Sequence, residues 1–112
     1  LRFPDPSSNP YLAFTAMLAA ALDGIDNQMN PPAALNHVNL YHLTPQERKE
    51  MGVNELPGSL AEALTELDKD EVIKAALGPE TYDAFTRAKS AEWDEYRIHV
   101  TDWEIERYLE VA

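Results

Sequence analysis

Cysteine is absent from the sequence, which excludes disulfide bonds and thiolate metal sites. Positive charge is scarce as well, because nine Lys and Arg residues face twenty Asp and Glu residues and the net charge is −11. Without a basic stripe, nucleic acid and anionic membranes are poor partners for this chain. The longest apolar run, Tyr11 to Leu22, is too short to cross a bilayer and follows no cationic signal region. These absences favour a cytoplasmic protein.

Length and composition predict one mainly α-helical domain over residues 1–112. A chain of 112 residues is long enough for at most one domain, and an apolar content of 45% argues against disorder. A compact monomer of this size would expose roughly 6,000 Å² of surface.

The first predicted helix is unusually apolar. Asn9 is placed to cap it, Pro10 suits its first position, and it should run to about Met29. Between Tyr11 and Leu22 only Thr15 is polar, and a helix that is apolar on nearly all sides must be buried on nearly all sides. That requires more covering surface than this chain readily supplies. We therefore expect exposed apolar area and self-association.

Capping boxes mark three later helix starts, because a Ser or Thr and a Glu three residues on can bond each other's backbone amides. These boxes open helices expected over residues 45–51, over 60–67 and from 102 onward: Thr44 to Glu47, Ser59 to Glu62 and Thr101 to Glu104.

Two more helices are predicted between the second and third boxes. Asp68 or Asp70 caps a short one that closes at Gly78-Pro79, and Pro79 begins the longest one, expected to reach about His99. The longest helix has one apolar arc at 100° per residue: Tyr82, Phe85, Trp93, Tyr96 and Val100.

The opening residues hold the first candidate site. Residues 1–8 are typical of a strand end followed by a proline corner, and Arg2 lies at the strand end, where enzymes hold anions. Guanidinium offers paired donors that match carboxylate or phosphate, although a surface salt bridge is the plainer interpretation. Since the sequence begins inside this strand, we expect it to be the tail of a larger protein.

Other candidate residues each have a plain alternative. The three histidines, His37, His42 and His99, share no metal-ligand spacing and are expected to be solvated or packed. Tyr41 is expected to pack on a neighbouring helix, and a modified or recognised tyrosine is the alternative. A C-terminal apolar stripe suits either an internal core or a finger inserted into a partner: Ile105, Tyr108, Leu109 and Ala112.

Short blocks along the whole chain point to one family. The first are Arg2-Phe3-Pro4-Asp5-Pro6, Asn9-Pro10-Tyr11-Leu12-Ala13-Phe14 and Leu22-Asp23-Gly24-Ile25. Later blocks follow in order: Asn39-Leu40-Tyr41, Leu56-Pro57-Gly58-Ser59-Leu60, Ala76-Leu77-Gly78, Ala88-Lys89, Glu92-Trp93-Asp94 and Trp103-Glu104. Together they resemble the C-terminal section of prokaryotic type I glutamine synthetase.

This resemblance implies the helical C-terminal section of an α+β catalytic domain, with a short N-terminal strand remnant. It also implies an ATP-dependent ligase that joins ammonia to glutamate through γ-glutamyl phosphate, with Mg²⁺ or Mn²⁺ bridging the phosphates. Arg2 matches the family's substrate arginine, which contacts glutamate and helps neutralise the transferring phosphoryl group. The family's metal-binding glutamate, ammonia-site acid and ATP-binding loops lie upstream of that arginine. The chain alone is therefore expected to bind no ATP or metal and to be inactive.

Two regulatory or assembly features are implied as well. Tyr41 matches the tyrosine that some members adenylylate, whereas the following Leu43-Thr44-Pro45-Gln46-Glu47-Arg48 is more similar to the subclass regulated by feedback and protein partners. The last helix resembles the segment that reaches across two stacked hexameric rings of a dodecamer. Its candidate inter-subunit contacts are Trp103, Ile105, Tyr108 and Leu109.

Two other function classes are open. A freestanding acidic helical module would bind another protein through its C-terminal stripe, and a small enzyme would need a catalytic constellation that cannot be assembled here. The opening Leu1-Arg2-Phe3 favours the ligase section over the module, because an independent module has no reason to start inside a strand.

Overall fold

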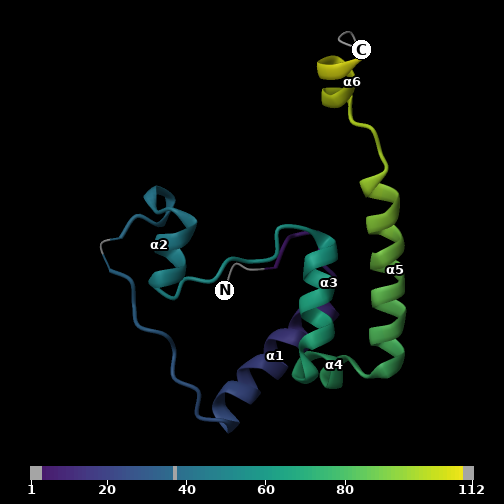
Figure 1. Ribbon diagram of the computed structural model, residues 1–112. Helices are drawn as coiled ribbons and strands as arrows, with labels where there is room; N and C mark the ends of the chain where they lie inside the picture. Colours follow the sequence, from purple (N-terminus) through teal and green to yellow (C-terminus); the bar gives the residue numbers. More distant parts are fainter. Residues whose placement is uncertain (1–3, 37, 110–112) are drawn as a thin grey trace. The chain divides into compact units, whose positions relative to one another are not determined.

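The described part of the chain is helical (Figure 1). The computed structural model describes residues 4–36 and 38–109, and over these residues it contains helices and no strand. The elements are α1 (Pro10–Asp26), the 3-10 turn η1 (Leu40–His42), α2 (Pro45–Glu50), α3 (Leu60–Lys69), α4 (Glu71–Leu77), α5 (Pro79–Arg97) and α6 (Asp102–Tyr108). The predicted mainly α-helical class is confirmed. The chain divides into two units at the Gly58–Ser59 peptide.

The segment before α1 is a turn. The Ser7 backbone N–H donates to Asp5 Oδ1 at 2.8 Å, and the Ser8 backbone N–H donates to the Asp5 carbonyl oxygen at 2.9 Å. The predicted proline corner is therefore present. The expected strand remnant, Leu1-Arg2-Phe3, lies outside the described residues.

Helix α1 begins as predicted and ends three residues early. Asn9 Oδ1 accepts from the backbone N–H groups of Tyr11 at 3.0 Å and Leu12 at 3.3 Å, which satisfies two otherwise unpaired amides. At the other end, Gln28 adopts a positive φ of 51°, and the next amide, of Met29, turns back to the Gly24 carbonyl oxygen at 2.9 Å. This left-handed residue ends the helix at Asp26, before the Asn30-Pro31-Pro32 segment expected to stop it.

The other helix starts follow the predicted caps. Thr44 and Thr101 each form a complete capping box with the Glu three residues later. Ser59 Oγ accepts from the Glu62 backbone N–H at 3.2 Å, and Asp70 rather than Asp68 caps α4. These bonds join near neighbours in sequence, so they form without help from tertiary packing.

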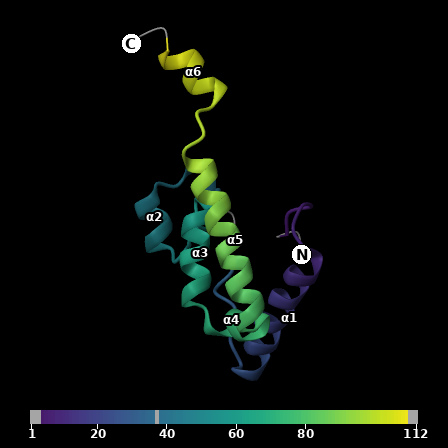
Figure 2. The ribbon, with the colours of Figure 1, turned by 90° about the vertical axis from the view of Figure 1, so that its right-hand side faces the viewer.

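In the second unit, α3 and α5 lie side by side and run in opposite directions, with the short α4 between them in sequence (Figures 1 and 2). Gly78 allows the reversal into α5, since its φ of 75° and ψ of 158° lie in a region that only glycine adopts without strain. Lys74 Nζ of α4 donates to the Asp68 carbonyl oxygen at 2.9 Å and lies 5.8 Å from the centre of the Tyr82 ring. This lysine therefore links all three helices.

The apolar arc of α5 is only partly covered. Tyr82, Phe85 and Trp93 are half-buried, but Tyr96 and Val100 are 68% and 62% exposed. Helix α5 has 19 residues against 10 in α3, so it is longer by roughly 13 Å at 1.5 Å per residue. The arc was predicted from periodicity, which does not reveal how far the neighbouring helix extends.

The described residues form no buried core. The accessible surface is 10,007 Å². Two separate compact units of half this mass would expose only about 7,500 Å² between them. None of the described helices is long and apolar enough to cross a membrane.

Helix α1 carries a continuous exposed apolar surface. One stripe along this helix and just beyond it is between 50% and 82% exposed: Tyr11, Phe14, Leu18, Leu22, Ile25 and Met29. The expectation that α1 lacks sufficient cover within this chain is confirmed.

Candidate functional site

Arg2, the predicted substrate-binding residue, lies outside the described residues, and so does His37. His42 is the last residue of η1, and His99 follows α5. Among the described residues, no group of three His, Asp or Glu side chains is arranged to hold a metal ion.

Tyr41 is fully presented to solvent. It is the central residue of η1, its side chain is 98% exposed, and its backbone N–H donates to Asn39 Oδ1 at 3.1 Å. The expectation that Tyr41 packs on a neighbouring helix is therefore wrong. The Asn39 cap fixes the backbone locally, while nothing in the described part of the chain covers the ring.

The C-terminal stripe is exposed too. Its members Ile105, Tyr108 and Leu109 are between 42% and 73% exposed, and Ala112 lies outside the described residues. Trp103, a further candidate inter-subunit contact, is 62% exposed. The Trp103 and Tyr108 rings meet edge to face, with centroids 5.9 Å apart. Of the two alternatives for this stripe, the internal core is excluded within the described residues, and an apolar surface available to a partner remains. In both views α6 lies beyond the end of α5 (Figures 1 and 2).

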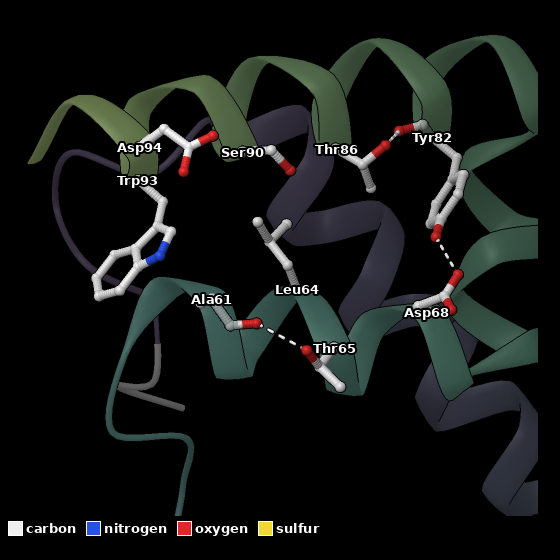
Figure 3. Close-up of a pocket in the computed structure, with 9 residues that line it drawn as sticks. All are labelled: Ala61, Leu64, Thr65, Asp68, Tyr82, Thr86, Ser90, Trp93 and Asp94. Carbon is white, nitrogen blue, oxygen red and sulfur yellow. Dashed lines mark hydrogen bonds between the residues drawn. The ribbon is translucent and has the colours of Figure 1, made fainter. Parts of the chain in front are cut away.

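A groove between α3 and α5 was not predicted from the sequence (Figure 3). Its volume is about 460 Å³, and Trp93 and Tyr82 stand near its two ends. Helix α3 contributes Ala61, Leu64, Thr65 and Asp68. Helix α5 contributes Tyr82, Thr86, Ser90, Trp93 and Asp94. Because Ala61, Thr65, Thr86 and Ser90 have short side chains, they leave space between the two helices unfilled.

One end of the groove is held by a charged network. The Tyr82 hydroxyl donates to Asp68 Oδ1 at 2.7 Å, and this hydrogen bond raises the pKa of Tyr82 above its usual value. Lys74 Nζ donates to Glu71 Oε1 at 2.8 Å, and this bond raises the pKa of Lys74. Both groups therefore keep their protons over the physiological pH range.

The candidate residues belong to two different units of the chain. Tyr41 belongs to η1 in the first unit, whereas the exposed stripe and the groove belong to the second unit.

Comparison with known proteins identifies the family. Residues 1–108 match the model of the glutamine synthetase catalytic domain. This chain belongs to the glutamine synthetase family. It is 51% identical over 108 residues to the glutamine synthetase of Thermotoga maritima and 50% identical over 109 residues to that of Thermus thermophilus. The resemblance inferred from the sequence blocks is confirmed.

The matches cover nearly all of this chain and a minor part of each glutamine synthetase. They take in 96% and 97% of the chain but 24% of each relative, so the chain spans about a quarter of the length of the curated relatives it matches. Two solved structures, a GmaS/ADP complex and an apo GmaS without ligand, match with TM-scores of 0.82 and 0.78 at 38% identity. The matched region again makes up 24% of each of these two chains.

Proposed function

We propose that residues 1–112 are the helical C-terminal section of a glutamine synthetase catalytic domain. The complete enzyme then joins ammonia to glutamate with ATP through γ-glutamyl phosphate. The observation that carries this proposal is the family match over residues 1–108, together with about half of all positions identical to glutamine synthetases. The share of 24%, together with the lack of a buried core among residues 4–36 and 38–109, supports a chain that functions with further polypeptide around it.

In this proposal Arg2 binds substrate. Its guanidinium contacts glutamate and lowers the energy of the transferring phosphoryl group by opposing its negative charge. The described residues lack a suitable donor set for Mg²⁺ or Mn²⁺, so we assign metal and ATP to the remainder of the catalytic domain. The 112-residue chain by itself is then inactive.

The proposal includes assembly into a homo-oligomer in the cytoplasm, a dodecamer by family resemblance. The exposed residues of α6 support an inter-subunit role, because a stripe with Trp103 62% and Leu109 73% exposed is costly to leave in water. Tyr41 is accessible to a modifying enzyme, and adenylylation there is a lesser part of the proposal.

A chimera tests the proposal. The corresponding quarter of the Thermotoga maritima enzyme is replaced by residues 1–108, and glutamine formation is measured with glutamate, ammonia and ATP-Mg²⁺. We expect activity in the chimera and none in the 112-residue chain alone. An inactive but correctly assembled chimera would contradict the ligase assignment and would favour a separate protein-interaction module.

Arg2→Ala in the active chimera tests the residue role. We expect kcat to fall by about 10²- to 10³-fold, the cost of removing one donor that stabilises developing charge. Arg87→Ala is the matched control, because Arg87 is an exposed arginine on α5 and should leave kcat unchanged. Equal effects of the two substitutions would remove Arg2 from the substrate site.

A further inference from the structure

We propose that the groove between α3 and α5 binds the side chain of an arginine carried by a basic segment of a partner protein. This inference goes beyond ligase activity, and binding can be measured without turnover. It rests on what the two walls of the groove offer to a ligand (Figure 3).

Three of the four hydroxyl groups that line the groove face a ligand as acceptors, and the fourth belongs to Ser90. Thr65 Oγ1 donates its proton to the Ala61 carbonyl oxygen at 2.9 Å, and Thr86 Oγ1 donates to the Tyr82 carbonyl oxygen at 2.8 Å. The Tyr82 hydroxyl donates to Asp68. A hydroxyl whose proton is committed retains lone pairs and can only accept from a further partner. Three hydroxyls therefore favour a ligand rich in N–H donors.

The charges around the groove also favour a ligand that donates N–H groups. The groove lining includes the carboxylates of Asp68 and Asp94 and contains no Lys or Arg, and the nearest cation at the Asp68 end is Lys74, which pairs with Glu71 outside the lining. Asp94 Oδ1 accepts from Arg97 Nε at 2.8 Å, but both side chains are more than half exposed, and such a pair holds its partners weakly. Each carboxylate keeps a second oxygen for another donor. With a net charge of −11 on the chain, a cationic ligand is attracted at long range as well.

The length of the groove and the indole ring of Trp93 favour arginine over other cationic side chains. Trp93 projects from α5 into one end of the groove (Figure 3). Indole is the best ring face for a cation, and the planar guanidinium both stacks on it and carries five N–H donors. Ala61 and Asp68 are seven residues apart on α3, which gives the groove a length of about 10 Å. An extended arginine side chain therefore fits between Trp93 and the acceptors on the two walls.

The test follows the two tryptophan indole N–H resonances of the full chain while the peptide acetyl-Gly-Arg-Gly-amide is added. Trp93 lines the groove and Trp103 lies on α6, so the second resonance is an internal reference. We expect a saturable shift of the Trp93 signal alone. The same peptide with uncharged citrulline, which keeps the shape of arginine, should produce no such shift.

Matched variants separate local recognition from net charge. Asp68→Asn removes one charge yet leaves an oxygen to accept from the Tyr82 hydroxyl, and Asp83→Asn removes one charge from the exposed surface of α5. We expect Asp68→Asn to weaken peptide binding by about two- to fivefold, the range for an exposed ion pair, and Asp83→Asn to leave it unchanged.

Four outcomes would overturn the proposal. They are the absence of a saturable shift, an equal response to citrulline, equal weakening by both substitutions, and a Trp93 shift on concentrating the chain without peptide. The last would show that a second copy of the chain occupies the groove.

Discussion

Replacing Leu18 by glutamine should sharply reduce self-association of the 112-residue chain. Leu18 lies at the centre of the exposed stripe of α1, between Phe14 and Leu22, and is itself 62% exposed. Leucine and glutamine have similar helix propensities, so the substitution changes the surface of α1 more than its stability. The perturbation therefore tests whether covering this stripe drives association.

The size of the effect follows from the exposed fraction. Fully burying a leucine is worth about 1.5–3 kcal/mol, so covering the exposed 62% of Leu18 contributes roughly 1–2 kcal/mol per copy. A contact between two copies involves the residue twice. The association constant should then fall by roughly 30- to 700-fold, at 1.4 kcal/mol per factor of ten.

Sedimentation velocity across micromolar concentrations measures this constant. Ala20→Gln is the control, because Ala20 is exposed on a different face of α1 and adds no apolar contact. The reasoning is refuted if the unmodified chain is a well-folded monomer at every concentration. It is also refuted if the two substitutions have the same effect.

Three further outcomes are expected. Gly78→Ala should cost about 1–3 kcal/mol of stability, because the φ of 75° and ψ of 158° at this position strain any residue with a side chain. Gly24→Ala should instead gain about 0.5–1 kcal/mol, because Gly24 lies within α1 and has open space for the new methyl group. Thermal denaturation of the two variants compares these effects. The bonds from the backbone and side chain of Thr101 lower the pKa of Glu104 below 4.5, so the stability they add is complete above that value and is lost as pH falls through the lowered pKa. The start of α6 should therefore fray in acid, as seen by amide exchange at Thr101, and Glu104→Gln should remove this pH dependence while keeping the cap. Tyr41→Ala should change stability by no more than about 0.5 kcal/mol, since the ring contacts little; a larger loss in thermal denaturation would mean that the ring packs after all.

The helix starts were predictable because their determinants are local. Asn9, Thr44 and Thr101 each bond amides two or three residues further along, so the relevant information lies within one helical turn. Helix ends were less predictable. The end of α1 depends on a left-handed Gln28, and glutamine carries no strong signal for that conformation.

The groove could not be predicted because it depends on the pairing of two helices. Thr65 and Thr86 are ordinary polar residues in the sequence, and their acceptor character follows from bonds to carbonyls within their own helices. Trp93 was expected on an apolar arc, but its position opposite Ala61 requires the chain reversal at Gly78. Periodicity gives the face of a helix and leaves open what stands across from it.

The candidate functional residues were likewise predictable only in part. Family blocks such as Asn39-Leu40-Tyr41 identified the family correctly, because they combine residue type with order along the chain. Packing of Tyr41 was predicted wrongly because aromatic residues are usually covered, and exposure is decided by tertiary neighbours. Arg2 stays a prediction, since it lies outside the described residues.

The local caps affect how the nascent polypeptide behaves. Helices whose first amides are hydrogen-bonded by the preceding residue can begin to form soon after they leave the ribosome. At that stage no other surface covers the apolar stripe of α1. Mutual repulsion between copies, each with a net charge of −11, opposes and slows their association at this stage. Salt screens this repulsion, so the ionic strength during synthesis or refolding affects the fraction of the chain that stays unaggregated and can assemble.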